Sequence, residues 1–159
     1  MRWFFAVFLM ILSGCASAPL AIGVRDFDAD FTGVQTGQAV FVKAQFDKPP
    51  VPVAQLTLEG SLIFQQTSAS FTFFASDSEP CNNRVSGFYI CNPNAPHIEQ
   101  SGTVNFSSGT TQPLRLSGNR LKSGINSGNL WLGVRLDSGG VASGTLQFRN
   151  LVARVAFVP

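Results

Sequence analysis

The chain offers few side chains for acid–base or nucleophilic chemistry. His97 is its single histidine, and it follows Asn94-Ala95-Pro96, a sequence typical of a loop. A Ser-His-Asp site would need this imidazole, and the sequence contains no G-x-S-x-G nucleophile elbow. We therefore expect no catalytic role for His97, no enzymatic activity and no cofactor, and we keep a hydrolase as an alternative.

Asp26, Asp28 and Asp30 alternate with apolar residues. On a β-strand, alternate residues share a face, so the three carboxylates would point the same way. Such a row of oxygens could hold Ca²⁺, and its spacing imitates the start of an EF-hand loop. That loop needs Gly at its sixth position and Glu at its twelfth, where this chain has Phe31 and Gly37. We expect a solvent-facing strand, with a calcium site or a partner contact as alternatives.

The N-terminus begins with the basic Arg2 and continues with ten apolar residues, Trp3 to Leu12. A run this short does not cross a membrane and has the length of a signal-peptide core. It leads into Leu12-Ser13-Gly14-Cys15, which resembles the lipobox of bacterial lipoproteins. The resemblance covers residues 1–15 only. It implies cleavage before Cys15, diacylglycerol on the Cys15 thiol and, usually, acylation of the new amino terminus.

Lipidation at Cys15 would fix both the organisation and the location of the protein. Two or three acyl chains are enough for stable anchoring in a membrane. In species with two membranes, Asp after the lipidated Cys tends to retain a lipoprotein at the inner membrane. Ala16 stands there in this chain, so we expect the outer membrane if the organism has one. The expected segments are a signal peptide at 1–14, a lipid-anchored tether at 15–21 and a single β domain at 22–159.

Two alternatives to the lipobox remain open. One is ordinary secretion with cleavage after Ala16-Ser17-Ala18, an A-x-A site that the following Pro19 disfavours. The other is an uncleaved cytosolic start, in which Cys15 is merely an apolar residue.

Cys81 and Cys91 remain as a pair once Cys15 carries lipid. Exported proteins meet an oxidising environment, so we expect these two residues to form a disulfide. Nine residues separate them, which is not the spacing of a redox C-x-x-C motif, although a reactive dithiol is the alternative. We expect no metal here, because His97 is the only imidazole that could complete a site.

The composition is that of a folded domain. Of 159 residues, 13% are charged and 45% are hydrophobic, and fifteen are Phe, which excludes a disordered chain. The length fits one domain. The formal net charge of +2 excludes a strongly electrostatic nucleic-acid binder.

After residue 20, apolar and polar residues alternate with a period of two, and no segment keeps a period of 3.6. In Ala54–Gln65 this alternation continues across Gly60, which predicts one long strand with a bend or bulge there. The apolar parity changes at Arg149-Asn150, which predicts a bulge or a change of sheet. Because Ser-Gly pairs and Pro clusters punctuate the strands, we expect an all-β antiparallel sandwich of seven to nine strands. A small β-barrel is the alternative.

Two aromatic side chains lie on the polar parity of their predicted strands. Trp131 alternates with Leu130, Leu132 and other apolar residues that would form the core face, and Phe41 lies between Ala39 and Lys43. A large aromatic side chain in such a position is either covered by a loop or exposed as a binding anchor. Trp131 and Phe41 are therefore possible partner contacts.

Charge is divided unevenly along the chain. Residues 16–80 hold seven acidic and three basic residues, a net −4, and residues 81–159 hold two acidic and seven basic residues, a net +5. Ordinary solvated strand faces, complementary faces within the fold, or a dipolar surface facing an anionic partner would each produce this division.

These features predict a membrane-anchored envelope lipoprotein that binds or stabilises another envelope component without catalysis. Its partners would be the membrane, through the N-terminal lipid, and an envelope protein, with no nucleic acid. The alternative is a barrel-type carrier whose Phe-rich interior holds an apolar ligand such as lipid or pigment.

Overall fold

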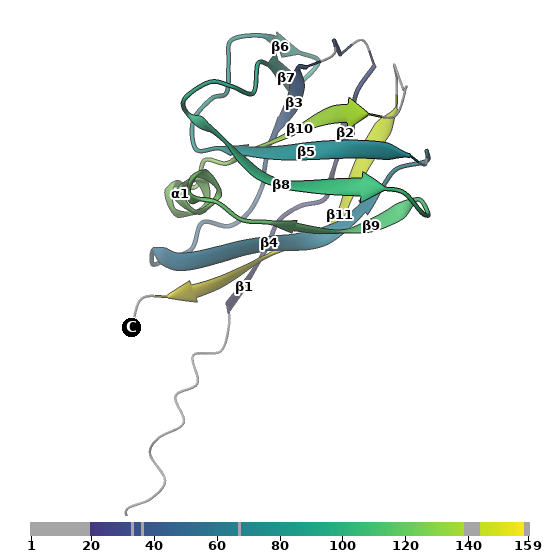
Figure 1. Ribbon diagram of the computed structural model, residues 1–159. Coiled ribbons are helices and arrows are strands. Elements are labelled where there is room, and N and C mark those ends of the chain that lie inside the picture. The colour runs from purple at the N-terminus through teal and green to yellow at the C-terminus, as the bar shows by residue number, and fades with distance from the viewer. Residues whose placement is uncertain (1–19, 33, 36, 67, 139–143, 158–159) are drawn as a thin grey trace, which may run out of the picture.

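The computed structural model describes residues 20–157 apart from 33, 36, 67 and 139–143. In these residues, eleven strands form two antiparallel sheets that face each other, and one short helix lies at one end (Figure 1). The predicted all-β sandwich is confirmed, and the sheets do not close into the alternative barrel. The strand number exceeds nine because four of the eleven strands have only two to four residues.

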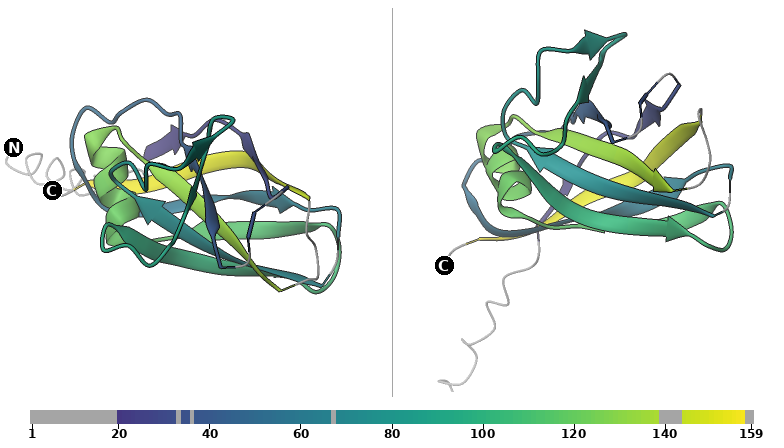
Figure 2. Two further views of the ribbon diagram at one scale, coloured as in Figure 1. Left: turned by 90° about the horizontal axis from the view of Figure 1, so that it is seen from above. Right: turned by 45° about the horizontal axis from the view of Figure 1, so that its top comes forward.

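The first sheet has the strand order β1-β11-β4-β9, and β2 also pairs with β11. Its two longest strands, of 11 and 13 residues, pair with each other, and Figure 2 shows the two sheets from two further directions. The strands are β1 (Leu20–Gly23), β2 (Phe27–Asp30), β4 (Val53–Ile63), β9 (Thr111–Leu116) and β11 (Thr145–Phe157).

The second sheet has the strand order β6-β7-β3-β10-β5-β8. Its inner strand β5 is almost entirely buried on both faces, with Phe71 and Phe73 toward the first sheet and Phe74 on the opposite face. The strands are β3 (Ala39–Lys43), β5 (Ala69–Ser76), β6 (Arg84–Val85), β7 (Phe88–Cys91), β8 (Ile98–Phe106) and β10 (Trp131–Ser138).

The predicted irregularities of β4 and β11 form one feature. β4 is a single strand across Gly60, and the pairing of β11 with it shifts between Arg149 and Val152. Asn150 has φ of 55°, as the extra residue of a bulge allows. A Cβ on Gly60 would come within 2.8 Å of Leu151 Cδ2. The bulge thus lies on β11, and the glycine of β4 makes room for it.

Phenylalanine side chains fill the space between the sheets. Phe64, Phe71 and Phe106 contact one another edge to face, with ring centroids 5.0 to 5.8 Å apart. Phe73 meets Phe148 of the other sheet in the same way at 5.9 Å. Such contacts stabilise the fold beyond the burial of the rings. These phenylalanines therefore form part of the hydrophobic core.

A helix that the sequence did not predict, α1 (Asn119–Ser127), covers one end of the sandwich (Figure 1). Leu121, Gly124 and Ile125 are its buried residues, spaced as one face of a short helix. Among the described residues, no helix combines the length and the apolar character needed to cross a bilayer.

Candidate functional site

The predicted lipidation site Cys15 and the signal peptide 1–14 lie outside the described residues. The described fold begins at Leu20, two residues before the predicted start of the domain, and β1 pairs with β11 from this first residue onward. Five residues of sequence, 15–19, therefore separate the candidate lipid from the first strand.

Cys81 and Cys91 form the predicted disulfide, with their Cα atoms 5.8 Å apart. They close a segment that contains the β6–β7 hairpin, whose two turn residues Ser86 and Gly87 have φ of 50° and 91°. Two positive φ angles are characteristic of a type I′ turn, which Ser-Gly permits. Because β7 pairs with β3, the disulfide fixes this hairpin at the edge of the second sheet.

Trp131 and Phe41, the possible partner contacts, are buried with 7% and 0% of their surface exposed. Both lie on the face of the second sheet that points away from the main core, as the parity predicted. They form a separate apolar cluster with Phe74 and Cys91, against which Cys81, Tyr89 and Ile98 pack. Of the two alternatives, cover rather than exposure as a binding anchor is therefore the one found, and the disulfide-bonded Cys81 and Cys91 are part of the cover.

The three aspartates lie on or next to β2, with the apolar Ala29 buried and the carboxylates exposed. Asp28 pairs with Arg149 at 2.7 Å. Asp30 accepts hydrogen bonds from the backbone and the hydroxyl of Thr32, chiefly the hydroxyl, which lower its pKa. The solvent-facing strand is confirmed, and no group of His, Cys, Asp and Glu in the described part of the chain is arranged to hold a metal.

His97 lies in the loop before β8, where its Nε2 atom is 3.1 Å from the carbonyl oxygen of Pro80. This contact links the residue before Cys81 to the loop that follows Cys91. The imidazole therefore has a backbone partner in the segment that precedes Cys81.

Ion pairs join the acidic first part of the chain to the basic second part. Three of the four ion pairs among the described residues join a carboxylate of the first half to an arginine of the second half. These pairs are Asp28–Arg149, Glu59–Arg154 and Asp77–Arg120. Two of these pairs join neighbouring strands of the first sheet and the third joins the end of β5 to α1, so none of the three joins the faces of the two sheets.

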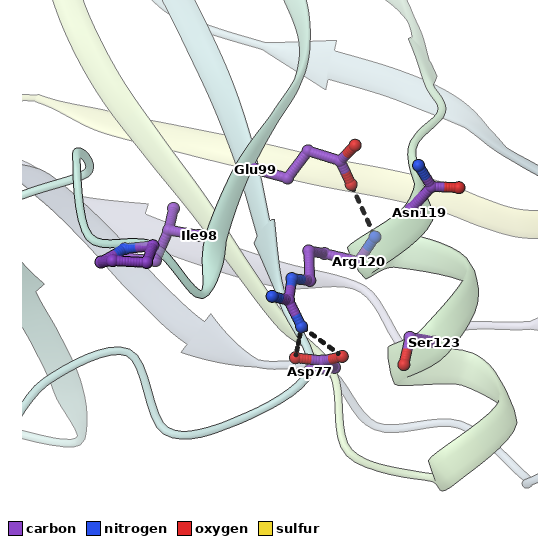
Figure 3. Close-up of a pocket in the computed structure, with 7 residues that line it drawn as sticks. Asp77, Ile98, Glu99, Asn119, Arg120 and Ser123 are labelled. Atoms are coloured by element: carbon purple, nitrogen blue, oxygen red, sulfur yellow. Dashed lines mark hydrogen bonds and ion pairs between the residues drawn. The ribbon is translucent and has the colours of Figure 1, made fainter.

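An open, mostly polar pocket of about 550 Å³ lies at the N-terminus of α1 and is here called the α1 hollow (Figure 3). It lies where the end of β5, the start of β8 and the first turn of α1 meet. The residues that line it are Asp77, Pro96, Ile98, Glu99, Asn119, Arg120 and Ser123.

Arg120 organises the α1 hollow through both its side chain and its backbone. Its Nη1 donates to both carboxylate oxygens of Asp77 at 3.1 Å, and its backbone N–H donates to Glu99 Oε2 at 2.6 Å. A carboxylate at a helix N-terminus is favoured by the unpaired N–H groups and the helix dipole. Gly118 leaves space for Glu99, because a Cβ there would lie 2.8 Å from the same oxygen.

The electrostatics of the α1 hollow favour an ionised Asp77. Its partial burial raises the pKa of the carboxyl group, but hydrogen bonds from Ser123 and Arg120 and the charge of Arg120 outweigh that effect, so the pKa is lowered overall. Arg120 keeps 41% of its side-chain surface exposed. Of its guanidinium nitrogens, only Nη1 has a hydrogen-bond partner among the described residues. The α1 hollow thus presents free guanidinium donors beside a satisfied carboxylate.

No protein-family profile matches the chain, and no curated protein matches its sequence.

We expect replacement of Asp77 by asparagine to destabilise the fold only at pH values where the carboxylate is charged. A carboxyl group whose pKa is lowered by folding stabilises the fold above its usual value of 3.8 and loses that contribution as the pH falls through the folded-state pKa. Because Arg120 is partly exposed, the loss at neutral pH should be about 0.5–1 kcal/mol.

Urea denaturation of Asp77→Asn and the wild type at neutral and strongly acidic pH measures this difference. Asp28→Asn, which breaks a more exposed arginine pair, is the matched control and should change stability less. A difference for Asp77→Asn that persists unchanged in acid would contradict the ion-pair explanation.

Proposed function

We propose that the protein is a lipid-anchored lipoprotein of the bacterial envelope, and that its β-sandwich binds or stabilises another envelope component without catalysis. The observation that carries this proposal is the place of Cys15 relative to the fold. The described fold begins at Leu20, so cleavage before Cys15 would leave every described strand in the mature chain. With Ala16 after the lipidated residue, the proposed location is the outer membrane where the organism has one.

The disulfide supports export. Cys81 and Cys91 are bonded, and disulfides persist in proteins outside the reducing cytosol. An even pair in the domain also leaves Cys15 as the cysteine available for lipid.

The carrier alternative is less well supported than the binding module. A carrier needs an interior left open for its ligand, whereas the Phe side chains of the two sheets pack against each other here. For the binding module, the α1 hollow is the candidate contact surface, because it is open, polar and has arginine donors without a partner.

Replacing Cys15 by serine should abolish incorporation of labelled palmitate and leave the uncleaved precursor in the cell, because the lipid bond requires the thiol. The matched control is the Cys81→Ser/Cys91→Ser double variant, which removes the disulfide but should still be labelled. Palmitate incorporation that continues in Cys15→Ser would show that the anchor is elsewhere.

Replacing Arg120 by methionine should reduce the recovery of envelope proteins cross-linked to the purified lipoprotein, because it removes the free donors of the α1 hollow. Interface arginines commonly contribute about 2 kcal/mol or more to binding, so recovery at limiting concentration should fall at least roughly tenfold. Arg135→Met is the control, since Arg135 also pairs with a carboxylate, Asp137, but lies on β10 outside the α1 hollow. Equal recovery from both variants would exclude the α1 hollow as the contact surface.

A further inference from the structure

The sequence between the lipid and the fold places one end of the domain close to the membrane. Five residue steps separate Cys15 from Leu20, and an extended chain spans at most about 3.6 Å per residue, so the reach is roughly 18 Å. This argument rests on the proposed lipid anchor. It follows that the surface around the start of β1 lies within that distance of the lipid headgroups.

The start of β1 and the start of β4 lie at this same end. Leu20 pairs with Val155 and Val53 pairs with Phe157, so both are next to the last residues of β11. The register places the two starts roughly 12 Å apart, given the usual strand spacing and rise. In Figure 1, β1, the left end of β4 and α1 all lie toward the lower left of the sandwich.

This end carries exposed apolar side chains. Leu20 is 45% exposed, and Val51, in the segment just before β4, is 50% exposed between the exposed residues Pro50 and Pro52. Among the described residues, the other large apolar side chain with such exposure is Val85, on the β6 strand of the disulfide-closed segment. A single exposed apolar residue is ordinary. Two of these three residues lie at the tethered end, however, and packing within the fold does not explain their exposure.

The segment that presents Val51 is held in place at both of its ends. Asn126 of α1 donates to the Val53 carbonyl oxygen at 3.2 Å and accepts from the Val53 N–H at 2.8 Å. The Lys48 side chain packs over Gly128, 3.3 Å from the position that a Cβ would occupy. The prolines also restrict the backbone, so Val51 already points outward in the free protein. Docking would therefore cost little conformational entropy.

Basic side chains flank this apolar tip. Lys48 is exposed beside it, and Lys122 lies one helical turn before Asn126 on the same face of α1. Asp47 is the nearest acidic residue in sequence, so the three residues carry a net charge of +1. Anionic lipid headgroups attract such a surface, whereas they would repel an acidic one.

We propose that Leu20 and the Pro50–Val51–Pro52 tip rest on the lipid surface in which Cys15 is anchored. The occupant of this apolar end is the bilayer, and the contact orients the sandwich on its membrane. The α1 hollow lies at the N-terminal end of α1, the helix whose C-terminal end holds the tip, so the same contact would also fix the direction in which the α1 hollow faces.

The orientation can be measured on the purified lipidated protein in vesicles of phosphatidylethanolamine and phosphatidylglycerol. An environment-sensitive fluorophore on Val51→Cys should show a blue shift and quenching by lipids that carry a spin label near the headgroup. The same fluorophore on Ser108→Cys, exposed in the loop between β8 and β9 at the opposite end, should keep its aqueous emission and remain unquenched.

The outcomes separate this inference from the anchor. Aqueous emission at position 51 in protein that carries the Cys15 lipid would overturn the docking surface and leave the anchor intact. A blue shift without quenching by spin-labelled lipid would show that protein, such as a second copy of the chain, covers the tip instead. Absence of the lipid on Cys15 would overturn the proposed function itself.

Discussion

Replacing Trp131 by alanine is expected to lower the free energy of unfolding by about 3–5 kcal/mol, the range typical of a buried large aromatic residue. Trp131 keeps only 7% of its surface exposed, within the apolar cluster that it forms with Phe41, Phe74 and Cys91. Its Nε1 atom is buried and has no hydrogen-bond partner in the described structure, so the side chain contributes through packing. Lys43, whose Nζ lies 4.9 Å from the ring centroid, would lose its aromatic partner as well.

Trp131→Phe is the matched variant and should cost clearly less than Trp131→Ala. It keeps much of the apolar volume and removes an N–H group that is not hydrogen-bonded, so no hydrogen bond is lost. Val85→Ala, on the covering hairpin but exposed, should change stability by no more than about 0.5 kcal/mol. Chemical denaturation measures all three, and a loss of less than about 1 kcal/mol for Trp131→Ala would mean that the covering segment does not bury the indole.

Replacing Gly133 by alanine is expected to destabilise the fold by about 2–3 kcal/mol, because the second sheet has no space for a side chain there. Gly133 pairs with Phe41 on one side and Phe74 on the other. A Cβ would lie 2.3 to 2.6 Å from three carbon atoms of the Phe41 ring, which is itself completely buried. The ring covers the glycine and cannot move away without displacing its neighbours.

The double variant Gly133→Ala/Phe41→Leu tests this mechanism, because the smaller side chain relieves the overlap. Its loss of stability should fall short of the sum of the single losses by about 1 kcal/mol or more. Gly23→Ala is the control, since no atom lies within 4 Å of a Cβ on this strand glycine. Strict additivity in the double variant would show that Phe41 is not the obstacle.

Alternation of residue types was enough to predict the half-buried strands. Leu56, Leu58 and Leu62 of β4 and Leu132 and Val134 of β10 all lie in the main core, as their parity requires. The parity change at Arg149-Asn150 likewise predicted the bulge of β11. These features follow from the period of two, which depends only on local geometry.

The features that the sequence did not predict depend on contacts between distant segments. β5 is buried on both faces, so Phe71, Phe73 and Phe74 form a run without alternation. α1 is only nine residues long, and its Ser123-Gly124 pair is typical of a turn. Cys81 and Cys91 pack in the same cluster as Trp131, and parity alone says nothing about a segment that folds over the outer face.

The α1 hollow was missed for the same reason. Asp77, Glu99 and Arg120 are 21 to 43 positions apart and share no motif. The one available signal was the opposite charge of the two halves of the chain. That signal was equally compatible with solvated strand faces, and it did not indicate which residues pair or where.

The measurement that tests the anchored lipoprotein most directly is the intact mass of the protein extracted from membranes with detergent. We expect a chain that begins at Cys15, with the Cys81–Cys91 disulfide closed and an added mass that corresponds to diacylglycerol with an amino-terminal acyl chain. A lipid-free chain beginning at Pro19, or an unprocessed chain beginning at Met1, would contradict the account.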